Sequence, residues 1–230
     1  MPQNNTMIEL YQFPWSPYCL PIQRLLEYSG TPFKLILVPP QERLTVWKLT
    51  KGRYYGLPTI RDGKKVIFED SDDTQNVAQY LDQKLKLNLF PAQQGGVQSI
   101  LLRYIENDVE GCAFRLNDVH YRENIRGVKL GPAHELQYLR FKERKFGRGC
   151  IDQWRAQTRD WLKKLETVLA PFESSLTHAP FLLGPRPLYV DFNLLGMLDN
   201  FLYSGKYRLP KSQPNIRRWH TQIKKLRKSI

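Results

Sequence analysis

Hydrophobic and polar positions follow two different periods in the first part of the chain. Residues 8–13 and 33–38 are strand-like, and between them apolar residues recur at helical spacing up to Gly30, a natural helix stop. Asp62-Gly63 is typical of a tight hairpin turn between two short strands. The predicted strands and helices are, in chain order, residues 8–13, 16–30, 33–38, 44–49, 59–61, 65–68 and 74–85. This order, β-α-β-α-β-β-α, predicts a small mixed sheet covered by helices.

The pattern changes after Pro91, where strand-like segments disappear and long amphipathic helices follow. Glycine and proline residues interrupt these helices at the points where they are expected to end. The predicted helices are residues 97–117, 134–146, 151–176, 190–203 and 214–228. We therefore predict two domains, an α/β domain over residues 7–86 and an all-α domain over residues 95–230.

Composition is typical of a soluble globular protein. The chain has 230 residues, of which 41% are hydrophobic and 25% charged, enough for one or two domains with buried cores. The polar segment 1–7 lacks the pattern of a signal peptide, and no apolar run approaches the ~20 residues of a membrane-spanning helix. Cys19, Cys112 and Cys150 are too far apart to predict a disulfide framework or a zinc site. We therefore expect a cytoplasmic protein with no metal and no membrane contact.

The formal net charge of +13 is the strongest compositional bias. Two explanations are open: a nucleic-acid partner, or a basic surface that attracts small anions. Much of the excess lies in residues 140–148 and 217–228, and such runs are usually solvated helix faces. We favour the small-anion explanation and do not expect nucleic acid to be the partner.

Two short segments carry the candidate chemistry. Ser16 and Cys19 fall at the predicted start of the first helix, where unpaired N–H groups and the helix dipole favour thiolates and other anions. About forty residues later, Pro58 opens a strand after Leu57. A proline at this place accommodates a cis peptide bond and leaves neighbouring backbone groups free for a ligand.

Five motifs occur in an order that resembles one known family. Residues 16–19 (Ser-Pro-Tyr-Cys) resemble a glutaredoxin-type motif whose first cysteine is replaced by serine, and residues 57–60 (Leu-Pro-Thr-Ile) resemble a cis-proline segment. Residues 73–81 resemble an acidic-Ser/Thr pair that opens a helix. Residues 181–192 and 214–219 resemble segments of an all-helical domain. Together they resemble the glutathione transferase superfamily, which implies a thioredoxin-like N-terminal domain followed by an all-helical domain.

The resemblance implies that a hydroxyl stabilises the thiolate of glutathione. Ser16 is our candidate for this role, and the alternative is that Ser16 only caps the helix. Cys19 is the rival candidate, at the place of the resolving cysteine of the motif, although a partly buried structural thiol is the alternative we favour. Tyr11 is a third candidate, because some branches of the family use a tyrosine near the end of the first strand.

The resemblance also implies how glutathione is bound. The backbone of Leu57, before a cis Pro58, is expected to pair with the cysteinyl part, and Asp73 and Thr74 to hold the γ-glutamyl ammonium and carboxylate. Here the chain departs from the family, because residues 69–72 separate this pair from the preceding strand. Glu69 and Ser71 are therefore alternative contacts. The candidate cations for the glycyl carboxylate are Lys48, Lys51 and Arg53.

The helical domain departs from the family pattern at one position. The family often has Ser or Thr three residues before Asp191, where this chain has Leu188, so only half of a capping box remains and Asp191 is predicted to be structural. Five residues on or after the first helix of this domain are candidates either for the electrophile pocket or for the core. They are Tyr104, Asn107, Asp108, Phe114 and Tyr121.

The leading hypothesis is a homodimeric glutathione transferase that conjugates glutathione, its co-substrate, to small, apolar electrophiles in detoxification. The first alternative is a glutathione-dependent thiol-disulfide reductase or peroxidase that uses Cys19. The second is a non-enzymatic binding module whose basic residues 214–230 contact an acidic partner or RNA. Fold alone does not fix which of these applies.

Overall fold

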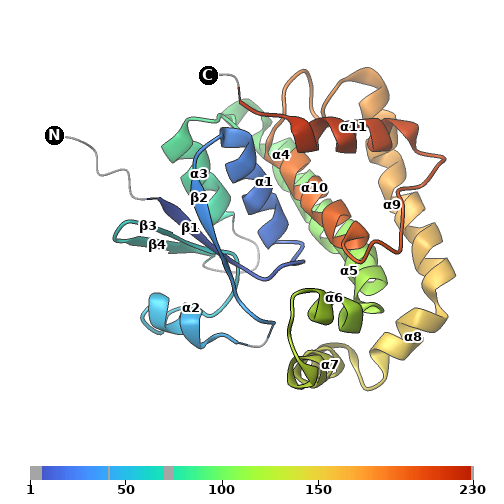
Figure 1. Ribbon diagram of the computed structural model, residues 1–230. Coiled ribbons are helices and arrows are strands. Elements are labelled where there is room, and N and C mark those ends of the chain that lie inside the picture. The colour runs from blue at the N-terminus through green and yellow to red at the C-terminus, as the bar shows by residue number, and fades with distance from the viewer. Residues whose placement is uncertain (1–6, 41, 70–74, 229–230) are drawn as a thin grey trace.

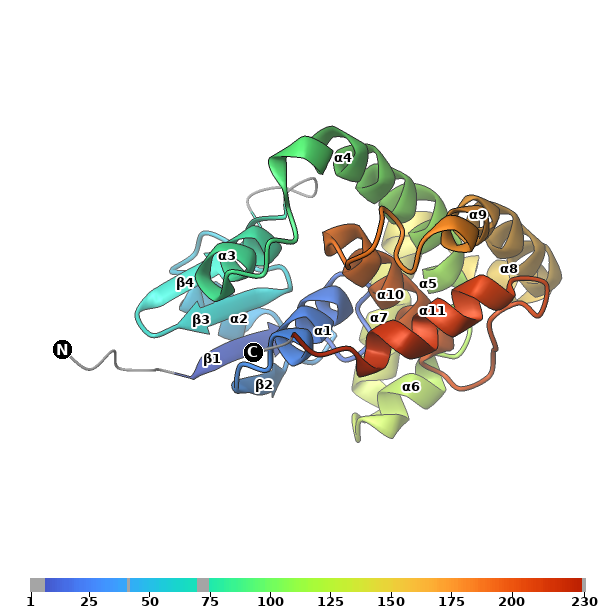
Figure 2. The ribbon, with the colours of Figure 1, turned by 90° about the horizontal axis from the view of Figure 1, so that it is seen from above.

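The computed structural model describes residues 7–40, 42–69 and 75–228. A small sheet with its helices forms one side of the molecule, and a larger group of helices forms the other (Figure 1). The first helix of the sheet domain lies against a central helix of the helical group in both views (Figures 1 and 2). The predicted fold class, a thioredoxin-like α/β part followed by an all-α part, is confirmed.

The sheet domain has the predicted element order. Its elements are β1 (Ile8–Gln12), α1 (Cys19–Ser29), β2 (Phe33–Leu37), α2 (Leu44–Leu49), β3 (Thr59–Asp62), β4 (Lys65–Phe68) and α3 (Asn76–Leu85). The strands are arranged β2-β1-β3-β4. The first pair is parallel, as a crossover through α1 requires, and the other two pairs are antiparallel.

Helices cover both faces of this sheet because successive side chains of a strand point to opposite sides. Leu10 on β1 and Ile60 on β3 are fully buried in the core that includes α1 and α3. Tyr11, the next residue of β1, packs instead with Val38 and with Val46 of α2. The end of β1 and the start of α1 are therefore enclosed between helices.

Helix α1 starts later than the sequence predicted. Residues 14–18 form turns, and the helix proper begins at Cys19, three residues after Ser16. The backbone carbonyl of Ser16 still accepts the N–H groups of Cys19 and Leu20, at 3.1 and 3.0 Å. The expected stop is confirmed, because Gly30 adopts the left-handed conformation with φ of 71°.

The helical domain differs from its predicted pattern in several places. Its helices are α4 (Gly95–Tyr104), α5 (Glu110–Asp118), α6 (Tyr121–Gly127), α7 (Pro132–Phe146), α8 (Cys150–Ala156), α9 (Thr158–His178), α10 (Tyr189–Leu202) and α11 (Pro214–Lys225), with a short 3₁₀ turn at Ala92–Gln94. The predicted helix 97–117 contains a wide π-helical turn over Ile105–Val109. Helix 151–176 is broken at Gln157, and the seven-residue α6 was not predicted.

The two parts of the molecule meet chiefly where α1 crosses α10. Helix α10 is buried along almost its whole length. A methyl group added to Gly196 would lie 2.3 Å from Cδ of Pro21 on α1, closer than any packed pair of carbon atoms. Arg24 and Asp199 form an ion pair of 3.0 Å across the same interface. The position of α1, and with it the candidate site, is therefore fixed from the helical side.

Asp199 also joins α11 to this interface. His220 Nε2 and Lys224 Nζ lie 2.9 and 3.1 Å from its Oδ1. The pKa of Asp199 is about 2, because hydrogen bonding and the positive charges of its partners outweigh the effect of burial. Within the described part of the chain, no helix is long and apolar enough to cross a membrane.

Candidate active site

A cavity of about 210 Å³ lies where the sheet domain faces the helical domain. Its walls come from the start of α1, the segment before β3, the start of α3, the π turn, α7 and α10. The described residues that line it are Tyr18, Ile22, Tyr54, Leu57, Pro58, Glu69, Gln75, Glu106, Lys145, Tyr189 and Asn193. Three of the predicted binding segments therefore meet at one cavity.

Ser16 lies in the turn that leads into α1, two residues before the cavity-lining Tyr18, and does not itself line the cavity. Its Oγ accepts the backbone N–H groups of Tyr18 and Cys19, each at 3.3 Å. A hydroxyl accepts through its lone pairs and keeps its own proton to donate. The capping role and a donor role are therefore compatible in one side chain.

Cys19 is fully buried beneath this turn. Burial raises the pKa of its thiol to about 11, although hydrogen bonding from Ser16 and Phe13 and the charge of Arg43 act in the opposite direction. At neutral pH only about one thiol in 10⁴ is ionised at such a pKa. The structure therefore brings Cys19 close to the helix start as a protonated, enclosed group.

Tyr11 lies away from the cavity. Its hydroxyl donates a hydrogen bond of 2.8 Å to Oε2 of Glu9, further back along β1. Its ring is 8% exposed and packs against the α2 side of the sheet. Burial, together with the hydrogen bond and charge of Glu9, raises the pKa of the Tyr11 hydroxyl.

The Leu57-Pro58 peptide bond is cis, as predicted, and both residues line the cavity. The preceding loop is held by Thr50, whose hydroxyl donates to the carbonyl of Tyr54 at 2.6 Å. Thr59 donates to the carbonyl of Gly56 at 3.0 Å. These two hydrogen bonds hold the backbone just before Leu57 and Pro58, and both of these residues line the cavity.

The start of α3 forms the next wall. Asp73 and Thr74, the predicted γ-glutamyl contacts, lie outside the described residues, as does Ser71. Glu69 is described, and its carboxylate accepts the first N–H groups of the helix, from Asn76 at 2.7 Å and Val77 at 3.2 Å. Glu69 thus places a negative charge at the positive end of α3.

Glu106 was not among the sequence candidates, although it lines the cavity. Gln75 Nε2 from the sheet domain and Asn193 Nδ2 from α10 both donate to its Oε1, each at 2.8 Å. The π turn widens the helix at this point, as such turns often do at functional sites. The helical pattern of the sequence gives no signal for such a turn.

The predicted cations Lys48, Lys51 and Arg53 are not among the described residues that line the cavity. Arg53 instead donates to the carbonyl of Thr50 and lies over the ring of Phe68. Among the described lining residues, Lys145 of α7 is the only cation.

Arg43, at the start of α2, is a cation that the sequence candidates did not include. Its Nη1 is buried with no hydrogen-bond partner in the described part of the chain. Burial lowers the pKa of its guanidinium, while Cys19, Glu42 and Tyr54 act in the opposite direction through their charges. Arg43 therefore lies within electrostatic reach of the start of α1 and of the cavity wall.

The remaining helical-domain candidates do not line the cavity. The Tyr104 hydroxyl donates to the Val168 carbonyl at 2.9 Å, and the Asn107 amide donates to the Arg103 carbonyl at 2.8 Å. Phe114 and Tyr121 are buried in a separate aromatic core. Among the described residues, no group of three or more histidine, cysteine, aspartate or glutamate side chains is placed to hold a metal ion.

A thioredoxin-like domain with a cis-proline wall, followed by an all-helical domain, defines a two-domain protein with a cleft between its parts. The sequence matches the models of the glutathione S-transferase N-terminal domain over residues 10–88 and of the C-terminal domain over residues 152–222. The chain belongs to the glutathione transferase superfamily. A search of curated protein sequences found no match.

Solved structures support the fold at low identity. A glutathione transferase of Phanerochaete chrysosporium is 19% identical with a TM-score of 0.78, covering 94% of this chain and 96% of that one. A glutathione S-transferase of Ceriporiopsis subvermispora in complex with glutathione is 20% identical with a TM-score of 0.73, covering 95% and 98%. Poplar glutathione transferase F1 is 19% identical with a TM-score of 0.64, covering 96% and 93%.

Proposed function

We propose that the protein is a glutathione transferase that joins the thiolate of glutathione to small, apolar electrophiles, in a detoxifying role. The observation that carries this proposal is the meeting of three segments at one cavity: the start of α1, Leu57-Pro58 and the start of α3. In the family these segments hold the cysteinyl and γ-glutamyl parts of the tripeptide.

The chemistry requires an ionised thiol near neutral pH. A thiol with an ordinary pKa of about 8.5 is only a few per cent ionised there, and lowering its pKa by ~2 units requires about 2.7 kcal/mol. The Ser16 hydroxyl and the N–H groups at the start of α1 are reasonable sources of this stabilisation. The thiol proton passes to solvent, the sulfur forms a bond to the electrophilic carbon, and the leaving group departs with the displaced electron pair.

The charged groups at the two ends of the tripeptide need protein groups of opposite charge. Glu106 and Asp73 are the proposed partners of the γ-glutamyl ammonium, and Thr74 is the proposed partner of its carboxylate. For the glycyl carboxylate we propose Arg43 in place of Lys48, Lys51 and Arg53. A buried guanidinium nitrogen without a partner is costly, and a ligand carboxylate would satisfy it.

Replacing Arg43 by methionine is expected to weaken glutathione binding about tenfold, because a charge-assisted hydrogen bond is lost. Calorimetry with glutathione and with γ-glutamylcysteine, which lacks the glycyl residue, measures this directly. The wild type should prefer glutathione, and Arg43→Met should bind the two ligands alike. Lys48→Met, which removes an exposed charge from the same helix, is the matched control. A variant that still prefers glutathione as strongly as the wild type would exclude Arg43.

The reductase alternative makes a different prediction for Cys19. A reductase nucleophile must be ionised and accessible, whereas this thiol is buried with a pKa of about 11. We therefore expect Cys19→Ser to retain conjugation activity within about threefold, with glutathione binding confirmed by calorimetry. The reductase would be supported instead if the wild type reduced disulfides but did not conjugate glutathione, and if Cys19→Ser lost the disulfide reduction.

The binding-module alternative relies on the basic C-terminal segment. Several of its cations already have partners within the chain: Lys224 pairs with Asp199, and Lys228 Nζ donates to the carbonyls of Leu85 and Lys86 at the end of α3. These contacts favour a structural role for part of the segment. The cytoplasm is our proposed location, supported by three cysteines that are all unpaired.

We also propose that the protein is a homodimer. On α4 the side chains of Val97 and Ile100 are 50% and 71% exposed, one turn apart. Light scattering should give twice the 27.1 kDa mass of the chain, and Ile100→Asp should reduce this to a single chain. Leu136→Asp, at an exposed position of α7, is the control that should remain dimeric. A wild-type mass of one chain would contradict the proposal.

A further inference from the structure

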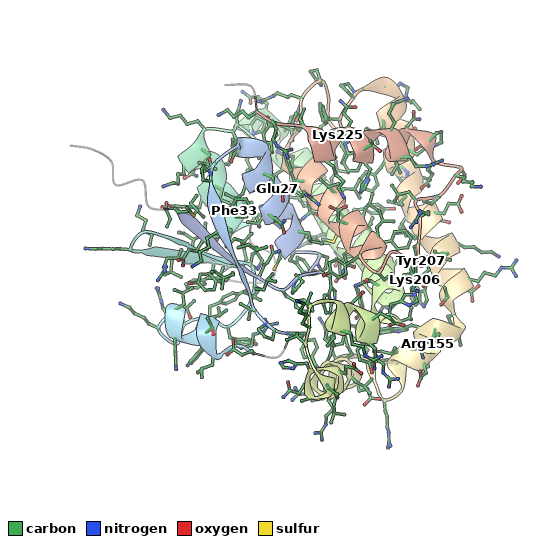
Figure 3. All side chains as sticks on the ribbon, in the orientation of Figure 1. Glu27, Phe33, Arg155, Lys206, Tyr207 and Lys225 are labelled. Carbon is green, nitrogen blue, oxygen red and sulfur yellow. The ribbon has the colours of Figure 1, made fainter. Side chains whose placement is uncertain are left out.

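A second concave site lies on the helical domain, separate from the candidate active site. It is a groove of about 500 Å³ formed where the α5–α6 turn, α6, the α8–α9 junction and the connection after α10 meet. The described residues that line it are Val119, His120, Arg122, Glu123, Arg155, Thr158, Lys206 and Tyr207. Figure 3 shows Lys206 and Tyr207 together on the same flank of the molecule as Arg155.

Positive charge predominates in this groove. The described lining residues include three cations and one carboxylate, that of Glu123. The cations are Arg122, Arg155 and Lys206. Arg122 is directed toward its own helix and α7, because its Nε donates to the Tyr121 hydroxyl at 3.1 Å and lies 3.9 Å from a carboxylate oxygen of Glu135. Arg155 and Lys206 are therefore the two cations that the groove itself presents.

These two cations differ in how they are held. Arg155 Nη2 donates to the carbonyl of Val119 at 3.2 Å, and Nη1 pairs with Asp152. The guanidinium is thus oriented before any ligand arrives, which lowers the entropic cost of binding. Lys206 is exposed and forms no ion pair within the described residues, so its ammonium group is available to a ligand.

His120 lines the same groove. Its Nε2 is 3.2 Å from the hydroxyl of Tyr207. The pKa of His120 is lowered, first by burial and then by the charges of Lys206 and Arg155, while Glu123 acts in the opposite direction. An anion bound beside these cations would reverse part of this effect, so His120 is a built-in reporter of the groove.

Tyr207 gives the groove a fixed aromatic wall. Its ring stacks on Phe201 with centroids 5.2 Å apart and an interplanar angle of 14°, and it contacts the His120 ring at 5.4 Å. A ring held on two sides keeps its orientation, and its edge or free face suits another aromatic group. The groove therefore joins two cations to an ordered aromatic surface.

We propose that this groove binds a small phosphorylated aromatic compound, with its phosphoryl group between Arg155 and Lys206 and its ring against Tyr207. A phosphate monoester carries nearly two negative charges near neutral pH, which matches two cations better than a carboxylate does. Arginine and lysine are the usual partners of phosphate oxygens. The proposal is independent of the glutathione chemistry, because none of these residues lines the other cavity.

Phenyl phosphate is the probe, with inorganic phosphate and phenol as its two halves. Calorimetry should show the tightest binding for phenyl phosphate, weaker binding for inorganic phosphate and none for phenol. In titrations followed by NMR, saturating phenyl phosphate should raise the pKa of His120. The chain has four histidines, so a His120→Gln variant assigns the resonance. An unchanged His120 pKa, or equal binding of phenol, would overturn the proposal.

Matched lysine variants separate a specific site from general attraction to a basic protein. Lys206→Gln should weaken phenyl phosphate binding about fivefold, whereas Lys225→Gln, which removes an exposed charge from α11, should leave it unchanged. Tyr207→Leu should weaken binding of phenyl phosphate more than binding of inorganic phosphate. Equal losses in the two lysine variants would show that the binding is unspecific and would overturn the proposal.

Discussion

Replacing Ser16 by alanine is expected to lower kcat/KM for glutathione conjugation about 25-fold near neutral pH. The lone pairs of Ser16 Oγ are engaged by the N–H groups of Tyr18 and Cys19, so its hydroxyl proton can be donated to a sulfur, either the buried Cys19 thiol or the thiol of bound glutathione. Without that donor, the pKa of the bound thiol returns toward about 8.5 and the ionised fraction falls accordingly. The loss should disappear at alkaline pH, where both enzymes hold an ionised thiol.

The ultraviolet absorbance of the bound thiolate, titrated against pH, measures this pKa without turnover. Glutathione affinity should change little, because the carboxylates of the tripeptide are proposed to be held by other residues. Ser16→Thr keeps a hydroxyl and should restore most of the activity. Ser29→Ala removes a hydroxyl from the other end of α1 and is the matched control. An unshifted titration in Ser16→Ala would reduce Ser16 to a cap worth ~1 kcal/mol.

The fold was predictable where local signals agree with one another. Strand periodicity, the Asp62-Gly63 turn and Gly30 at the end of α1 each specify one element, and the structure contains all of them. The sequence did not predict the places where a helix changes its winding or is interrupted. The π turn over Ile105–Val109 and the break at Gln157 occur inside continuous helical patterns, and both depend on tertiary packing.

The candidate site was predictable in its backbone and less so in its side chains. The Leu57-Pro58 segment has a local signature, and its cis bond was expected. Glu106 and Arg43 have no local sequence signature. Glu106 is placed by the π turn, and Arg43 is one of 35 basic residues, from which only its burial distinguishes it. Likewise, sequence spacing could not reveal that Cys19 is fully enclosed.

Asp191 shows how one buried residue connects the helical domain to the site. It is fully buried, and its Oδ1 accepts from the backbone N–H of Leu182 at 3.0 Å and from Nε1 of Trp219 at 3.1 Å. Its Oδ2 accepts from the N–H of Leu188 at 3.0 Å, the half of the capping box that the sequence predicted. One carboxylate thus joins the turn before α10, the start of α10 and the middle of α11.

Replacing Asp191 by alanine should lower the free energy of unfolding by about 3–5 kcal/mol, because three buried N–H donors lose their carboxylate acceptor and a cavity remains. For a chain of this size, we expect the melting temperature to fall by roughly 10 °C. Urea unfolding and thermal melts measure both quantities.

Trp219→Phe removes one donor together with its hydrogen bond and should lower the free energy of unfolding less than Asp191→Ala does. In the double variant the two losses should not add, because the donor and its acceptor are removed together. Strictly additive losses would mean that Asp191 and Trp219 stabilise the domain independently, and α10 would then need another anchor to hold α1 in place.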